Sequence, residues 1–346
     1  MAASFAAEEA TAVGRLGFDD SVVPPWIMVP MQGKRLVVLK DGKDLSLGLR
    51  NAASGVVTFQ EQPHPQGRGV QLTPVAPGTV FLEARDAGGG VKAALEITVK
   101  RRKTLSTAFI GIFDKSGRSS TGGIGGAEHM VEVANKLYLP QANVELSHQA
   151  SRGVALTFDM PTGMPTIFPP FVAAKSWDRN TPGPLPCISS RPPGRFGAGG
   201  NIPLCILEDR LIPPLRSLDD LDAIRRTQML INVVVHVEPN SDYNIFFVRS
   251  LDQHANAGGL VGFTKGFTPL KLDGAAINAC FIQDSAATGH TLAHELGHFL
   301  LSPTPAFMPR DGHSRGRDDL MSSTQGPTDI RIPKAQANFM NPSGVP

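Results

Sequence analysis

Short apolar runs alternate with turn residues over the first third of the chain, between residues 22 and 100. A period of two residues is visible in residues 80–84 and again in residues 94–99. The apolar runs are separated by turns rich in Gly, Pro, Asp and Lys and cover residues 35–39, 45–49, 56–59, 70–73, 80–84 and 94–99. Short strands at this spacing predict an all-β sandwich over residues 21–102. Residues 1–20 are predicted to form a small helix or an N-terminal tail.

The pattern becomes mixed after the basic run Lys100–Lys103, which we interpret as a solvated linker. Periodicity and breakers predict strands at 105–113, 144–147, 153–158, 230–237, 243–249, 260–264 and 275–282, and helices at 127–139 and 217–226. Residues 160–214 are so rich in Pro and Gly that we expect an irregular insertion there, or a lid over a cleft. Residues 103–346 are therefore predicted to form an α+β domain.

Composition excludes several classes of protein. Of 346 residues, 41% are hydrophobic, which is ample for a buried core and excludes a wholly disordered chain. The formal net charge of +2 argues against a nucleic-acid partner bound by bulk electrostatics. No segment approaches the roughly 20 apolar residues of a membrane span. The first 20 residues lack the basic and apolar regions of a classical signal peptide.

The segment GHTLAHELGHFLL, residues 289–301, carries the candidate chemistry. Its apolar positions predict a helix, with N-cap candidates at Asp284, Ser285 and Thr288. His294, Glu295 and His298 match the pattern H-E-x-x-H, and residues four apart share one face of a helix. The two imidazoles would meet at one point, as zinc requires, with Glu295 beside them to deprotonate a water molecule. The alternative is a helix with two surface histidines.

With this motif, the chain from about residue 230 to its end resembles the zincin metallopeptidases, and among them the metzincins. The similarity lies in the order of strands before the H-E-x-x-H helix, in the segment DDLMSS, and in residues 332–340. DDLMSS, residues 318–323, resembles the Met-turn, which implies that Met321 lies beneath the zinc ligands. Residues 332–340 resemble the terminal helix. The resemblance implies one catalytic Zn²⁺ and a zincin-like fold for residues 103–346, with a mixed twisted sheet and an active-site helix.

The resemblance also implies a place for the substrate. Family members bind an extended peptide as an additional strand along the edge of the sheet, where backbone N–H and C=O groups are available. The matching edge strand in this chain gives the substrate-binding candidates Gly259, Leu260, Val261, Gly262 and Phe263. A protein or peptide substrate is therefore expected.

The third ligand departs from the metzincin pattern. The compact motif has Gly three and His six residues after the second histidine, where this chain has Leu301 and Thr304. No Glu follows Glu295, so the glutamate ligand of other zincins is excluded as well. The resemblance places the third ligand just before the Met-turn, which points to His313, with Asp311 as the alternative.

The function that the resemblance implies is a zinc-dependent endopeptidase. Zn²⁺ would be held by His294, His298 and His313, and Glu295 would act as general base. Two alternatives stay open: a zinc amidase acting on cell-wall peptides, and a non-enzymatic binding protein on a zincin scaffold.

Residues 71–100 resemble the C-terminal half of bacterial immunoglobulin-like modules. The resemblance implies an immunoglobulin-like sandwich that contacts a target or a secretion machinery. Because a classical signal peptide is missing, we expect a toxin-like effector exported by a signal-independent route, or otherwise a cytoplasmic protein.

Overall fold

The computed structural model describes residues 2–8, 16–50, 55–113, 125–156, 238, 240–248, 259–260, 271–272, 275–276, 279–283, 287–301, 314, 319–322 and 330–345. These residues form a mixed α+β structure with several sheets and few helices. The chain divides into two compact units. The first contains Met1–Leu105, His129–Ser147 and Leu292–Pro346, and the second contains Ser106–Glu128 and His148–Thr291. This division differs from the predicted boundary after residue 102, because two later stretches of the chain join the N-terminal strands in one unit.

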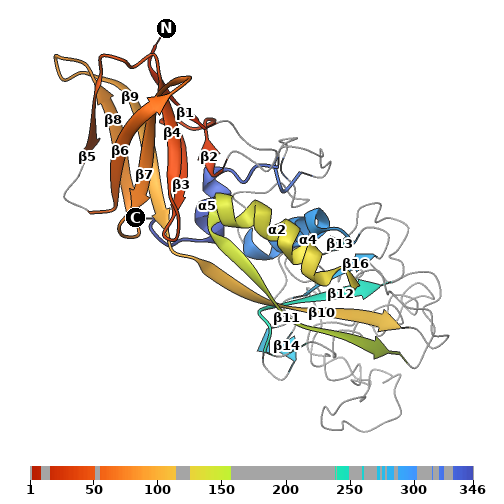
Figure 1. Cartoon of the computed structure of the whole chain (residues 1–346). Coiled ribbons are helices and arrows are strands. Elements are labelled where there is room, and N and C mark those ends of the chain that lie inside the picture. Colours follow the sequence, from red (N-terminus) through yellow and green to blue (C-terminus); the bar gives the residue numbers. More distant parts are fainter. Residues whose placement is uncertain are drawn as a thin grey trace, which may run out of the picture. The chain divides into compact units, whose positions relative to one another are not determined.

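Two sheets make up the N-terminal part of the first unit (Figure 1). One has the order β1 (Ser4–Ala7), β4 (Arg35–Lys40), β7 (Gly67–Pro74) and β6 (Val57–His64). The other has the order β2 (Phe18–Asp19), β3 (Trp26–Pro30), β9 (Val91–Lys100), β8 (Gly78–Arg85) and β5 (Ser46–Arg50). Neighbouring strands are antiparallel except β3 and β9, which are parallel. Val37 and Leu39 of one sheet share a buried core with Leu82 and Ile97 of the other, as in a sandwich.

Residues 1–20 differ from the predicted helix or tail. Ser4–Ala7 pairs with β4, and Phe18–Asp19 pairs with β3. Phe5 and Phe18 are both buried in the core of the sandwich. Burial of these two aromatic side chains stabilises pairing that so short a segment would not maintain alone.

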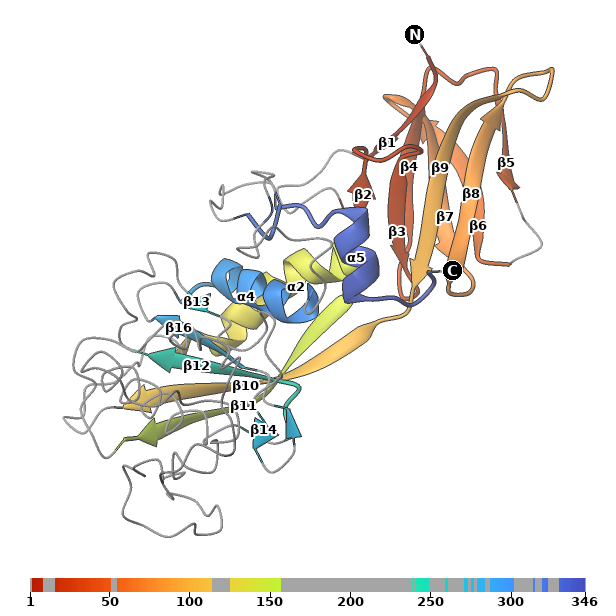
Figure 2. The ribbon, with the colours of Figure 1, turned by 180° about the vertical axis from the view of Figure 1, so that it is seen from behind.

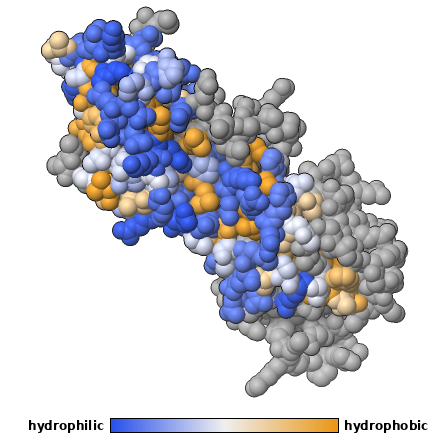
Figure 3. All heavy atoms as spheres, viewed as in Figure 1, coloured by the Kyte–Doolittle hydropathy of each residue, from blue (hydrophilic) through white to orange (hydrophobic). Residues whose placement is uncertain are grey.

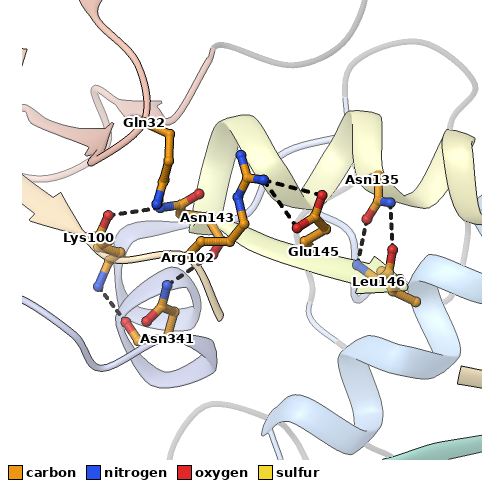
Figure 4. Close-up of polar contacts among 8 residues, drawn as sticks. All are labelled: Gln32, Lys100, Arg102, Asn135, Asn143, Glu145, Leu146 and Asn341. Carbon is orange, nitrogen blue, oxygen red and sulfur yellow. Dashed lines mark hydrogen bonds and ion pairs between the residues drawn. The ribbon is translucent and has the colours of Figure 1, made fainter. Parts of the chain in front are cut away.

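The basic run after β9 is also different from the predicted solvated linker. Only two residues separate β9 from β10 (Lys103–Phe113), and the side chain of Lys100 is fully buried. Lys100 Nζ donates to the carbonyl oxygen of Asn341 at 2.6 Å (Figure 4). It also donates to the carbonyl oxygen of Ser343 at 3.3 Å. Asn341 Nδ2 in turn donates to the carbonyls of Arg101, Ala142 and Asn143. The C-terminal segment is thereby fastened to the junction of β9 and β10.

The buried lysine predicts a pH dependence of stability. Burial lowers the pKa of Lys100 from 10.5 to about 8. Below that pKa the lysine is charged in both states, and the folded state bears the full cost of burying the charge. As the pH rises from about 8 to about 10.5, the folded chain releases this proton before the unfolded chain does. Relative to Lys100→Met, the free energy of unfolding of the wild type should therefore increase, by up to about 3 kcal/mol.

Urea unfolding at a series of pH values measures this difference. Lys40→Met, at the exposed end of β4, is the matched control and should follow the wild-type profile. A difference between wild type and Lys100→Met that stays constant with pH would contradict the expectation.

Three helices have most or all of their residues in the first unit: α2 (Ala127–Ala142), α4 (Gly289–Leu301) and α5 (Lys334–Met340). The helix predicted at 127–139 continues through Pro140 and ends where Asn143 has a left-handed φ of 51°. α4 runs beside α2 in both views of the ribbon (Figures 1 and 2), and the hydroxyl of Tyr138 donates to the carbonyl of Ala293 across this contact.

The second unit contains most of a five-stranded sheet. Its order is β11 (Val144–Ala155), β10, β12 (Tyr243–Val248), β16 (Ala279–Gln283) and β13 (Gly259–Leu260). β10, β12 and β16 are parallel, whereas β13 is antiparallel to β16. All residues of the central strand β12 are buried. The predicted strands 144–147 and 153–158 are one strand, β11.

The second unit also contains a separate pair of short strands. The hairpin pairs β14 (Lys271–Leu272) with β15 (Ala275–Ala276), so the predicted strand 275–282 is divided between β15 and β16. The predicted strand 230–237, the predicted helix 217–226 and the insertion 160–214 lie outside the described residues.

Hydrophilic residues cover most of the described surface on the face drawn in Figure 3, and apolar residues gather there only in small groups. The large apolar side chains that are exposed among the described residues are Val23, Val75, Val91 and Val345. None of the described helices is both long enough and apolar enough to cross a membrane.

Candidate metal centre

The H-E-x-x-H segment is helical, and a neighbouring threonine caps the start of this helix. The helix α4 begins at Gly289, and Thr288 Oγ1 accepts a hydrogen bond from the backbone N–H of Thr291 at 3.1 Å. This contact identifies Thr288 as the N-cap among the three candidates of the sequence. Asp284 and Ser285 lie outside the described residues. Four of its apolar residues, Leu292, Ala293, Leu296 and Leu300, are buried, and Phe299 is partly buried.

The helix brings the two histidines of the motif together. The ring centroids of His294 and His298 are 4.8 Å apart, and the rings meet edge to face at 87°. His294 is buried, with 8% of its surface exposed, and His298 is partly buried. Their spacing of four residues places both rings on one side of α4, one turn apart.

A backbone carbonyl fixes the ring of His294. Its Nδ1 lies 2.8 Å from the carbonyl oxygen of Leu320, and both groups are buried. A carbonyl oxygen only accepts, so Nδ1 carries the proton and the lone pair of the neutral imidazole is at Nε2. Histidines that bind a metal through one nitrogen commonly donate their other N–H in this way. This contact therefore favours the tautomer of His294 in which the Nε2 lone pair can bind a metal ion.

The turn that supplies this carbonyl also packs against α4. Met321 is fully buried, and a Cβ atom added at Gly297 would overlap its Sδ. The same Cβ would lie 3.3 Å from the hydroxyl oxygen of Tyr138. Only glycine leaves room for both neighbours. The structure thus packs Met321 against α4, the helix that carries His294.

Glu295 and Tyr138 form a second buried feature of this centre. Glu295 is 2% exposed, and Tyr138 is fully buried on α2. Burial, and after it the negative charge of Glu295, raise the pKa of Tyr138 well above its ordinary value. Tyr138 therefore stays a neutral donor and holds the Ala293 carbonyl, one residue before His294, at 2.6 Å. The sequence indicated only that Tyr138 lies on a predicted helix, with no signal for this contact.

The turn itself is held by Asp319, which the sequence analysis did not single out. Asp319 Oδ1 accepts from the backbone N–H of Met321 at 2.9 Å, and Oδ2 accepts from Gln336 Nε2 at 3.0 Å. Burial raises the pKa of Asp319, and these hydrogen bonds oppose the shift. Asp319, two residues before Met321, was visible in DDLMSS, but its partner Gln336 is 17 residues away.

The remaining predicted site residues fall in two groups. Gly259 and Leu260 form β13, which is one of the two edge strands of the five-stranded sheet as far as the described residues show it. His313 and Asp311 lie outside the described residues, as do Val261, Gly262 and Phe263. Within the described part of the chain, no group of three or more His, Cys, Asp or Glu side chains is arranged to hold a metal ion. Of the predicted ligands, the described residues bring together the two imidazoles of α4.

Comparisons with known proteins add little to this geometry. No protein-family model and no curated protein sequence matches the chain. A similar solved structure is that of metalloproteinase-II from Bacteroides fragilis. The two chains are 10% identical, and the match covers 89% of this chain and 81% of the other, with a TM-score of 0.32. That score is too low to establish a shared fold.

Proposed function

We propose that this protein is a zinc-dependent endopeptidase. The observation that carries the proposal is the hydrogen bond between His294 Nδ1 and the Leu320 carbonyl. A histidine on an ordinary surface helix has no need of a buried carbonyl that fixes its tautomer. Because this bond puts the proton on Nδ1, the lone pair of Nε2 can bind a metal ion, next to the ring of His298.

The donor set fits zinc. Imidazole nitrogen is a preferred zinc ligand, and catalytic sites use three protein ligands with one position left open. His294 and His298 supply two of them, and we propose His313 as the third, with Asp311 as the alternative. Zinc, when bound, supplies a Lewis acid that activates water and polarises a carbonyl group.

Glu295 is the proposed general base. It follows His294 directly on α4 and is almost completely buried, so its carboxylate acts where water competes little. In this proposal Glu295 takes the proton from the attacking water and returns it to the leaving amine when the peptide bond breaks. Tyr138 keeps the backbone of this turn in place through the Ala293 carbonyl.

An extended peptide is the proposed substrate. β13 is an edge strand, and an edge strand offers backbone N–H and C=O groups to a further strand. We therefore retain residues 259–263 as the proposed substrate-binding strand. Main-chain pairing of this kind favours an endopeptidase, because it captures the middle of a chain as readily as its end.

The sandwich is proposed to be an immunoglobulin-like module that begins with β1 at Ser4, before the predicted range of residues 21–102. Its strand order supports this, because β1-β4-β7-β6 corresponds to the A-B-E-D sheet of that fold and β9-β8-β5 to its G-F-C strands. In keeping with the sequence resemblance, we propose that the module contacts a target or a secretion machinery, as in a toxin-like effector.

Zinc content tests the proposal. The purified full-length chain should contain about one zinc per molecule and hydrolyse members of a peptide library. His294→Ala and His298→Ala should lose both the zinc and the hydrolysis, since two ligands bind the ion too weakly to retain it. The matched control is His129→Ala, which changes an exposed histidine of α2 and should retain both. A wild-type chain that lacks zinc and stays inert after zinc is added would overturn the proposal.

A further inference from the structure

We infer that Asp319 and Gln336 are positioning residues of the metal centre. They hold the turn 319–322 against α4 and thereby fix the ring of His294. The inference rests on the proposed function, because it concerns how a metal ligand is oriented. It extends that function to α5 and to the sandwich, neither of which supplies a ligand.

The first step is that the backbone of Leu320 is held through both its carbonyl and its N–H group, which belong to two successive peptide groups. Its carbonyl accepts from His294 Nδ1 at 2.8 Å. Its N–H donates to the carbonyl of Arg331 at 2.9 Å. The orientation of the His294 ring therefore depends on where the backbone of Leu320 lies, and not on α4 alone.

The second step is that the Asp319 carboxylate closes the turn around Leu320. Oδ1 accepts from the N–H of Met321, and the Asp319 carbonyl accepts from the N–H of Ser322 at 2.9 Å. The carboxylate is buried, with 9% of the residue exposed. A buried carboxylate is costly unless its oxygens accept hydrogen bonds, so the turn is stable only with its donors in place.

The third step is that Gln336 ties this carboxylate to α5. Gln336 Nε2 donates to Asp319 Oδ2 at 3.0 Å, and Gln336 is 5% exposed. α5 is in turn anchored on the sandwich at its first residue. The N–H of Lys334 donates to Asp19 Oδ2 at 2.9 Å, and its Nζ pairs with Glu96 at 2.5 Å. A continuous path of contacts thus joins His294 to β2 and β9.

The hydrogen bonds of Asp319 predict different effects for its replacement by alanine and by asparagine. Asp319→Ala removes both acceptors and leaves the Met321 N–H and the Gln336 amide without partners. Asp319→Asn keeps one oxygen for Met321 and presents an NH₂ group to Gln336. Gln336 Oε1 is buried and has no hydrogen-bond partner in the described structure, so a rotated Gln336 amide can accept from that NH₂ group. The asparagine variant should therefore rescue what the alanine variant loses.

Zinc affinity and a cobalt spectrum test the inference on the full-length chain. A chromogenic chelator competes for Zn²⁺, and Co²⁺ put in place of zinc reports ligand geometry through its visible absorption. Asp319→Ala and Gln336→Leu should weaken zinc binding by about 10- to 100-fold, the range for loss of an outer hydrogen-bond partner of a metal ligand, and alter the cobalt spectrum. Asp319→Asn should stay within about 3-fold of wild type, since its hydrogen bonds are restored.

The matched control is Thr98→Val. It removes two hydrogen bonds of the sandwich, from Trp26 Nε1 to Thr98 Oγ1 at 2.9 Å and between Thr79 Oγ1 and Thr98 Oγ1 at 3.1 Å. It should lower thermal stability without changing zinc affinity or the cobalt spectrum. If Asp319→Ala fails to fold, Gln336→Leu makes the same test, because it removes only one hydrogen bond.

The outcomes are distinguishable. Wild-type zinc affinity and an unchanged cobalt spectrum in Gln336→Leu and in folded Asp319→Ala would overturn the inference and leave the proposed function standing. An equal loss of affinity in Thr98→Val would also overturn it, because the effect would then follow global stability. A wild-type chain that binds no zinc would overturn the proposed function itself.

Discussion

Replacing Glu295 by glutamine should lower kcat/KM for peptide hydrolysis by about 100- to 10,000-fold, while about one zinc per chain is retained. Glutamine has nearly the same shape as glutamate but cannot take a proton from water. Glu295 is 2% exposed and lies between two histidines of one helix, so no solvent-exposed group can readily replace it. Steady-state kinetics together with zinc analysis of the same sample measure both quantities.

The control for this substitution is Glu132→Gln, the same chemical change at an exposed residue of α2. It should leave both the rate and the zinc content unchanged. Near-normal hydrolysis by Glu295→Gln would show that Glu295 is not the base. Loss of zinc from Glu295→Gln would instead make Glu295 a ligand and contradict the proposed division of roles.

His313→Ala should weaken zinc binding by more than about 100-fold, with the folded state largely retained. Loss of an outer partner costs up to about 100-fold in metal affinity, and loss of a direct ligand removes a coordinate bond as well. Asp311→Ala should cost less than about 10-fold, because in the proposed set Asp311 is at most an outer partner of His313. Zinc retention by both variants under the same chelator makes the comparison.

The opposite order would change the ligand set. If Asp311→Ala sheds its zinc while His313→Ala keeps it, the ion is bound by two histidines and an aspartate. The metzincin resemblance of residues 318–323 would then be misleading. Circular dichroism of both variants separates loss of a ligand from loss of the fold.

Local sequence determined the elements that depend on the spacing of apolar residues and on helix caps. The alternation in residues 80–84 and 94–99 predicted strands that are present as parts of β8 and β9. The apolar positions of residues 289–301 predicted α4, and Thr288 was one of three N-cap candidates for its start. Helical geometry then puts His294 and His298 on one side without reference to the rest of the chain. Each of these features is decided within a few residues, which is why the sequence was sufficient.

Tertiary structure decided everything that depends on a distant partner. Lys100 was predicted to be solvated because a run of charges usually is, but the C-terminal carbonyls of Asn341 and Ser343 surround its ammonium group. The carbonyl that fixes His294 is 26 residues away, and the one that Tyr138 holds is 155 residues away. A backbone carbonyl carries no sequence signature, since every residue has one. The sequence therefore determined which side chains carry the candidate chemistry, and only the packed chain decided which backbone groups orient them.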